Sequence, residues 1–107
     1  ELIREKVFRM TRQEVPYSTG VEIEQFTEEE REDGIPFVEI YAKIIVERKP
    51  QKGIVIGKGG TMLKRIGTAA RKDIARLLGA RVHLNLHVSV VPRWTEKPHI
   101  LHEFGIE

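Results

Sequence analysis

The residues most suited to binding chemistry form a short glycine-rich segment, Gly57 to Gly60, whose second residue is Lys58. Because glycine has no Cβ atom, another molecule can come close to its main-chain N–H groups. An apolar run precedes the segment and a basic amphipathic stretch follows it, so we expect a helix end on each side. Free N–H groups and the dipole of a helix N-terminus favour phosphate, and the Lys58 ammonium adds a point charge. The segment therefore predicts non-covalent binding of a phosphate-bearing molecule.

The spacing of the glycines excludes two other phosphate-binding motifs. A P-loop needs four residues between its first glycine and the Gly-Lys pair, but only Ile54 to Ile56 separate Gly53 from Gly57. A dinucleotide fingerprint needs a third glycine where this sequence has Met62, and a strand before the loop. Neither nucleotide-binding motif is therefore predicted.

Length and composition set the class of protein. With 107 residues, 40% of them hydrophobic and 32% charged, the sequence predicts one soluble globular domain. It contains no cysteine, which excludes disulfides and thiolate zinc sites. No apolar run approaches the roughly 20 residues that span a bilayer. We expect a cytoplasmic protein.

The charges are unevenly distributed although the net charge is only +2. Ten basic residues lie between Arg48 and Arg81, where Asp73 is the single acid, whereas seven acids and one base lie between Glu22 and Asp33. Such blocks arise from a solvated helix face and an acidic loop, or from a binding surface for phosphates. Because the basic block is centred on the glycine segment, we interpret it as a phosphate-binding surface, with the acidic block repelling a polyanion.

Hydrophobic periodicity predicts the elements that must position the glycine segment. The expected order is α-β-β-α-α-β in an α+β fold, with helices on one face of a three-stranded sheet, forming a single domain over residues 1–107. The outer sheet face should carry Tyr41, Ile45 and His87. The helices are expected at Glu1 to about Gln13, 51–56 and 61–78, the strands at 21 to about 26, 38–46 and 81–90, and a tail, including a short helix at 97–104, over about 92–107.

The long helix after the glycine segment has the clearest pattern. Gly79 stands where a helix-ending glycine is expected, and Gly67 in the helix interior predicts close packing against a neighbour. The expected buried stripe consists of Met62, Leu63, Ile66, Ala70, Ile74, Leu77 and Leu78.

A G-x-x-G loop between the second and third helices of this order resembles a type II (prokaryotic) KH domain, whose loop grips four backbone nucleotides of a single strand. The runs 51–60, 62–68 and 70–74 are similar to the C-terminal domain of the Era family of bacterial GTPases, as are 4–6, 14–18, Trp94 and 104–105. That family carries a GTPase domain N-terminal to this one. Since the sequence begins at Glu1 without methionine, we expect a part of a longer protein, with GTP and Mg²⁺ bound only by the absent domain and no cofactor here.

The resemblance implies binding of single-stranded RNA at the 3′ end of small-subunit ribosomal RNA during ribosome assembly. The implied partners are the small ribosomal subunit and the GTPase domain in cis, with peripheral contact of the parent protein at the inner membrane. Apolar Ile56 would offer a floor for unstacked bases. The implied RNA-binding residues are Gly57, Lys58, Gly59 and Gly60 in the loop, Lys52, Ile54 and Ile56 before it, Thr61, Lys64 and Arg65 after it, and Ile45 and Val46 as strand positions near the base edges.

Other functions are less well supported by the residues. His83 and His87 share a strand face, but four strand residues span roughly 13 Å, too far for one metal. His99 and His102 lack a third ligand with suitable spacing, so we expect no catalytic site. Trp94 and Phe104 are interpreted as a pair that docks the tail. A KH fold used for protein assembly, and a KH domain of another ribosomal or transcription factor, remain as alternatives.

Overall fold

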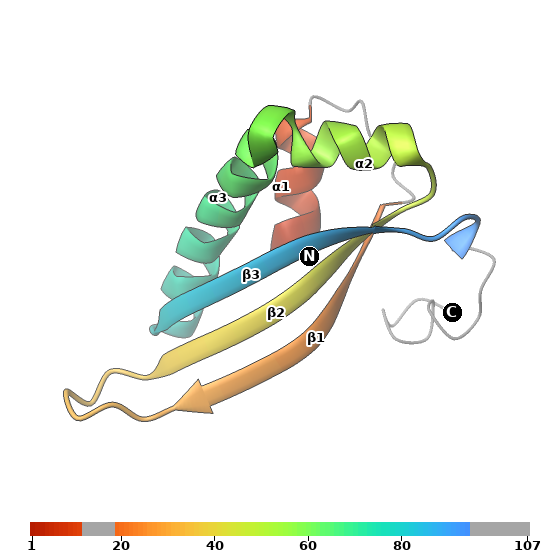
Figure 1. Cartoon of the computed structure of the whole chain (residues 1–107). Coiled ribbons are helices and arrows are strands. Elements are labelled where there is room, and N and C mark those ends of the chain that lie inside the picture. Colours follow the sequence, from red (N-terminus) through yellow and green to blue (C-terminus); the bar gives the residue numbers. More distant parts are fainter. Residues whose placement is uncertain (12–18, 95–107) are drawn as a thin grey trace.

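The computed structural model describes residues 1–11 and 19–94, and its elements follow the expected order (Figure 1). The long helix begins at Thr61 and ends at Leu78, with Gly79 in the left-handed conformation, as predicted. The elements are α1 (Leu2–Met10), β1 (Gly20–Glu29), β2 (Phe37–Val46), α2 (Lys49–Ile56), a single 3-10 turn η1 (Lys58–Gly60), α3 (Thr61–Leu78) and β3 (Arg81–Val90).

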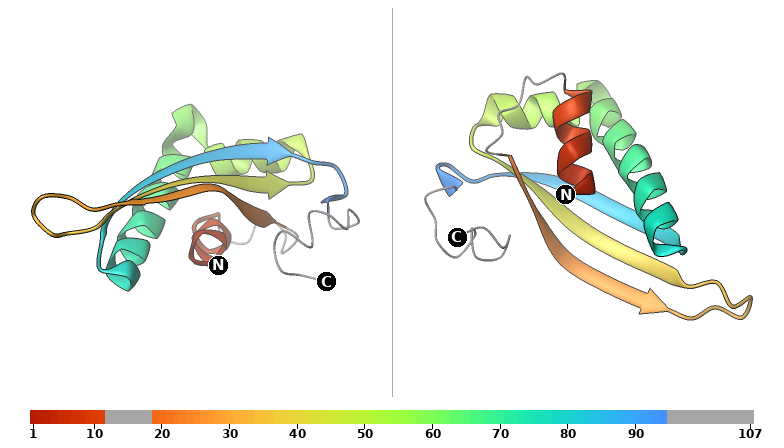
Figure 2. Two further views of the ribbon diagram at one scale, coloured as in Figure 1. Left: turned by 90° about the horizontal axis from the view of Figure 1, so that it is seen from below. Right: turned by 180° about the vertical axis from the view of Figure 1, so that it is seen from behind.

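The three strands form one sheet in the order β1-β2-β3, so β2 is central and β1 and β3 are edges. β1 runs antiparallel to β2, and β3 runs parallel to it, with Phe37 opposite Arg81 and Val46 opposite Val90. A parallel pair requires a crossover connection, which α2, η1 and α3 supply. The right-hand view of Figure 2 shows the helices on one face of the sheet. The predicted α+β fold with helices on one face is confirmed.

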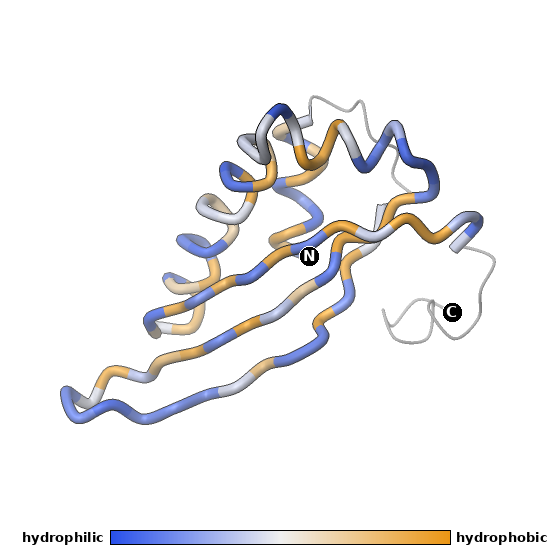
Figure 3. The backbone as a smooth tube through the Cα atoms, viewed as in Figure 1, coloured by the Kyte–Doolittle hydropathy of each residue, from blue (hydrophilic) through white to orange (hydrophobic). Residues whose placement is uncertain are grey.

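The core lies between the sheet and the helices. Side chains alternate along the strands, and Figure 3 shows this as alternating hydrophobic and hydrophilic colour. Central β2 contributes every second residue to the core, because both of its neighbours shield it. The buried apolar residues of this core are Ile3 and Val7 from α1, Val38, Ile40, Ala42, Ile44 and Val46 from β2, Val55 from α2, Ile66 and Ala70 from α3, and Val82 and Val88 from β3.

Four expectations from the sequence are wrong in detail. Ile45 is fully buried rather than exposed on the outer sheet face, because Trp94 packs over it. Leu77 and Leu78 are exposed by 75% and 43%, so the buried stripe of α3 ends before them. β1 continues to Glu29, beyond the expected end near 26. The first helix ends at Met10, with Thr11 as its C-cap, before the expected end near Gln13. The docking partner expected for Trp94, Phe104, lies outside the described residues, as does the short helix at 97–104.

Candidate nucleic-acid interface

The glycine loop is held in place by a contact between its first residue and α3. Gly57 has φ 74° and ψ 175°, a conformation that is essentially restricted to glycine. A Cβ atom at this position would lie 2.6 Å from Cβ of Met62, so the backbone of the loop touches the start of α3 directly. Its N–H donates to the Gly53 carbonyl at 2.8 Å, which closes α2. Gly57 therefore fixes the angle between α2 and α3.

The next two glycines have a different environment. Gly59 and Gly60 have φ values of 64° and 80°, and no atom lies within 4 Å of a Cβ built on either one. Their backbone thus needs the left-handed region and also faces open space. Lys58 between them and Gly57 is exposed. A chain of phosphates can reach the main chain here without meeting a side chain.

The start of α3 adds donors to this open backbone. Gly60 precedes the helix, no side chain caps the first turn, and that turn contains no acidic residue. Free N–H groups at such a helix start attract anions. Thr61, one of the predicted RNA-binding residues, does not cap the helix. Its hydroxyl donates a hydrogen bond to the Lys58 carbonyl at 2.9 Å. Thr61 therefore orders the loop and leaves the helix donors available.

A groove of about 370 Å³ runs from the loop along one side of α3 to the edge strand β3. Its floor is apolar, formed by Leu63 with the half-buried Leu84 and Leu86. Gly67 faces Leu86, whose Cδ1 lies 3.6 Å from a Cβ built on that glycine. The predicted close packing at Gly67 is therefore an ordinary contact. The residues that line the groove are Gly60, Leu63, Lys64, Gly67, Thr68, Arg71, Leu84, Asn85 and Leu86.

Sequence reasoning missed the contribution of β3 to this groove. Because β3 is an edge strand, the main-chain groups along its outer side pair with no described strand. The segment from Leu84 to Leu86 brings that side into the groove. The expected order of elements contained a signal for this contribution. Two helices connect β2 to β3, and this crossover places β3 next to β2 and beside α3, at the sheet edge opposite β1.

The two strand residues predicted to lie near base edges have a different position. Ile45 and Val46 belong to central β2, and their side chains are exposed by 0% and 1%. The Val46 carbonyl accepts a hydrogen bond from Val91 N–H at 2.8 Å. Neither side chain reaches the groove beside β3, so any contact of this segment with a base is restricted to the main chain.

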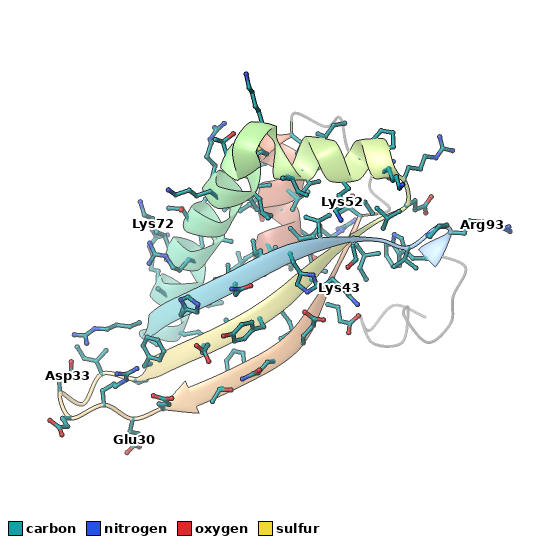
Figure 4. The ribbon with its side chains drawn as sticks, in the orientation of Figure 1. Glu30, Asp33, Lys43, Lys52, Lys72 and Arg93 are labelled. Atoms are coloured by element: carbon teal, nitrogen blue, oxygen red, sulfur yellow. The ribbon has the colours of Figure 1, made fainter. Side chains whose placement is uncertain are left out.

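The remaining predicted residues are divided between the two sides of α3. Lys64 lines the groove, whereas Ile54, Gly57 and Arg65 line a second hollow of about 410 Å³ on the other side, next to Met10 of α1. Ile56 is half-buried and packs against the core, and Lys52 is half-buried on α2 without lining either hollow (Figure 4). The groove thus joins Gly60 at the end of the loop with Lys64, whereas Gly57 and Arg65 lie outside it.

The basic block remains largely uncompensated. Arg76 pairs with Asp73 at 3.4 Å, and Arg81 pairs with Asp33 at 2.8 Å. Asp73, the only acid of the block, also contacts Lys6 at 2.7 Å, and these two cations hold the pKa of Asp73 below its usual value. Within residues 1–11 and 19–94, no ion pair involves the other eight cations, which are Arg48, Lys49, Lys52, Lys58, Lys64, Arg65, Arg71 and Lys72. Their charge is available to a polyanion.

A helix–loop–helix with an open G-x-x-G turn, beside a groove that ends at an edge strand, defines a KH-type nucleic-acid-binding domain. The KH domain family matches residues 14–95, and the chain belongs to this family. This confirms the fold expected from the loop.

Comparison with individual proteins refines the assignment. The chain is 58% identical over 107 residues to GTPase Era of Trichlorobacter lovleyi and 49% identical over 108 residues to GTPase Era of Thermotoga maritima. It spans 35% of the length of each, at their C-terminal part. The structure matches the crystal structure of an Era variant from Aquifex aeolicus bound to GDP.AlF4- with a TM-score of 0.85 and 39% identity, covering 97% of this chain and 34% of that one. The expected resemblance to the Era family is confirmed.

A second matching solved structure contains RNA. It contains Era in complex with MgGDPNP and nucleotides 1506–1542 of 16S ribosomal RNA. The match has a TM-score of 0.84 at 39% identity, and it covers 97% of this chain and 34% of that chain.

Proposed function

We propose that this chain is the RNA-binding module of an Era-type GTPase and binds single-stranded RNA at the 3′ end of small-subunit ribosomal RNA during ribosome assembly. The observation that carries the proposal is the continuity of one surface. The open backbone at Gly59 and Gly60 leads directly into the groove between α3 and the edge of β3. The relative whose structure contains 16S ribosomal RNA supports the choice of RNA.

Different parts of this surface bind the phosphates and the bases of an RNA strand. Phosphates lie against the N–H groups of the loop and the start of α3, with Lys58 and Lys64 nearby. Unstacked bases lie on the apolar floor formed with Leu84 and Leu86. The main-chain N–H and C=O groups on the outer edge of β3 can then form hydrogen bonds with base edges, in place of the bonds that they would form with a neighbouring strand. A duplex cannot present its base edges in this way, so single strands are preferred.

In this role the chain binds RNA and catalyses no reaction. GTP hydrolysis belongs to a preceding domain of the parent protein, and that protein is cytoplasmic. Across the described part of the chain, no three His, Cys, Asp or Glu side chains are grouped as metal ligands. In the same residues, no helix has the length and apolarity to cross a membrane. The partners of this chain in the proposed role are the small ribosomal subunit and the GTPase domain in cis.

The test is titration of this chain with a short RNA that ends in the pyrimidine-rich 3′ tail of small-subunit ribosomal RNA. A scrambled RNA and a duplex are titrated in parallel, each at two salt concentrations. We expect preference for the tail and a salt slope of about 0.7 per neutralised phosphate. Equal binding of all three RNAs would leave only non-specific charge attraction and would contradict the proposal.

Two double variants locate the site. Lys58→Asp with Gly59→Asp places negative charge in the loop and should abolish binding while circular dichroism remains unchanged. Lys49→Asp with Gly34→Asp makes the same changes at an exposed lysine and an exposed glycine of positive φ outside the loop. This matched variant should bind RNA nearly as well as the unmodified chain. If both variants lose binding equally, the loop is not the site and an assembly role for the fold is favoured.

A further inference from the structure

The outer edge of β1 is a second open edge of the sheet, opposite the one that faces the RNA groove. β1 pairs with β2 along one side, and no strand in the described residues covers its other side. In an antiparallel pair, alternate residues direct their N–H and C=O groups away from the partner. All residues from Ile23 to Glu29 except Thr27 are exposed. This edge can therefore accept another strand.

The two faces of β1 differ in chemistry. Ile23 and Phe26 lie opposite the buried Ala42 and Ile40, so they are on the helix side of the sheet, yet they are exposed by 51% and 55%. α1 packs only against the start of β1, where Val21 meets the core, and the described residues leave Ile23 and Phe26 about half uncovered. A neighbouring strand with apolar side chains on the same face would cover them.

The charge at this edge is negative and only partly compensated. Glu22 pairs with Lys43 at 3.4 Å, and Glu24 contacts His87 at 2.5 Å, both across the outer sheet face. By contrast, no ion pair reaches Glu28, Glu30 or Glu32 from any described residue. Figure 4 shows Glu30 and Asp33 at the tip of the hairpin, far from Lys72 on α3. A partner with positive charge is therefore favoured, and RNA is repelled.

The same features disfavour pairing between two copies of this chain. The register between β1 and β2 shifts between Ile23 and Gln25, so Glu24 forms a bulge in the edge strand. Bulges and charged side chains are common means of preventing edges from pairing with one another. Two such edges would also bring acids against acids, whereas a basic strand would not meet this repulsion.

We propose that the outer edge of β1, from Ile23 to Glu29, is a docking site for an extended basic segment of a protein, which adds to the sheet as a fourth strand. Main-chain hydrogen bonds hold the segment. Its apolar residues lie beside Ile23 and Phe26, and its alternate lysines or arginines lie near the acids on the outer face of β1. Because the RNA groove is at the opposite edge, this site is independent of RNA binding.

The probe for the test is a peptide of alternating lysine and valine, about six residues long as in a typical strand, with blocked ends. Two control peptides have the same composition: one is scrambled so that the alternation is lost, and one carries N-methyl groups at alternate residues. Amide spectra of the isotope-labelled chain report the site. We expect the alternating peptide to shift the signals of Gln25 to Glu29 and to slow their hydrogen exchange.

Two charge variants test the contacts. Glu24→Lys with Glu29→Lys, both on the outer sheet face, should weaken binding by about tenfold, whereas Glu30→Lys with Glu32→Lys, of equal net charge but beyond the strand, should weaken it far less. Equal binding of the N-methylated peptide would exclude strand addition. Shifts confined to the outer sheet face, or no binding by the alternating peptide, would overturn the proposal. Concentration-dependent shifts of β1 without peptide would show that a second copy occupies the edge instead.

Discussion

Gly57 and Met62 are in backbone contact, because a Cβ atom on Gly57 would lie 2.6 Å from Cβ of Met62 and 2.9 Å from its nitrogen. This contact is between rigid parts of the chain and cannot be relieved by turning a flexible side chain. It joins the end of α2 to the start of α3, and it thereby sets the shape of the loop that we propose to bind phosphate. The first glycine of the motif is therefore structural.

We expect Gly57→Ala to destabilise the fold by about 3 kcal/mol or more, from overpacking together with a backbone conformation reserved for glycine. Thermal unfolding followed by circular dichroism measures this loss. The matched variant is Gly59→Asn, since Asn tolerates the left-handed region and open space surrounds Gly59. It should unfold within about 1 kcal/mol of the unmodified chain and bind RNA more weakly. Similar stability of the two variants would contradict this assignment.

Gly67→Ala should stabilise the chain, in contrast to the loop glycines. Glycine inside a helix costs roughly 0.5–1 kcal/mol relative to alanine. The new methyl group would lie 3.6 Å from Leu86 Cδ1, an ordinary van der Waals distance. We therefore expect a melting temperature higher by several degrees, about 4–8 °C for each kcal/mol. A lower melting temperature would mean that the groove floor has no room for a methyl group.

Trp94 should be a structural residue of the outer sheet face. It is 3% exposed, packs with Ile45 and Val91, and is the only tryptophan. Trp94→Ala should cost roughly 3–5 kcal/mol, and Trp94→Phe clearly less, in chemical denaturation. The fluorescence of the unmodified chain should be blue-shifted and move to the red on unfolding. Emission typical of an exposed indole in the folded chain would refute this packing.

Local signals explain what the sequence predicted well. The bounds of α3, its C-terminal glycine and the G-x-x-G loop depend on residues that are neighbours in the chain, and all three are found in the structure. The apolar residues that alternate along β2 are likewise buried. These features require no knowledge of how distant segments meet.

The missed features depend on distant segments. Alternation placed Ile45 outward, but the chain after β3 returns to it, with Val91 bound to the Val46 carbonyl and Trp94 over Ile45. Leu77 continues the apolar stripe, yet α3 extends beyond the N-terminal end of α1, so that none of the described helices covers its last turn (Figure 2). The role of β3 in the groove follows from strand order, which the periodicity of one strand does not contain.

The ion pair between Lys6 and Asp73 predicts a pH dependence of stability. Lys6 Nζ lies 2.7 Å from Asp73 Oδ2 and joins α1 to α3, and chiefly this hydrogen bond lowers the pKa of Asp73 below its ordinary value of 3.8. The contribution is therefore present above pH 3.8 and is lost as the pH falls through the lower pKa of the folded state. Asp73→Asn should lower the melting temperature at neutral pH but not in strong acid.

The control for this pair is Glu5→Gln, which removes the exposed pair of Glu5 with Arg9 within α1. Exposed pairs at this helical spacing are worth only about 0.3–0.5 kcal/mol. The melting temperature of Glu5→Gln should therefore stay close to that of the unmodified chain at neutral pH. A loss in Asp73→Asn that is equally large in strong acid would show that the carboxylate charge is not the cause.

Arg71 and Lys72 are adjacent on α3 but should contribute differently to RNA binding. Arg71 lines the groove beside β3, whereas Lys72 lies with Arg65 and Met10 around a neighbouring hollow next to α1. Arg71→Gln should weaken RNA binding and reduce the salt slope by about 0.7, the value for one phosphate contact on a single strand. Lys72→Gln removes the same charge one residue away and should leave the slope nearly unchanged. Equal slopes for the two variants would indicate that RNA responds to the total charge of the helix and does not lie in the groove.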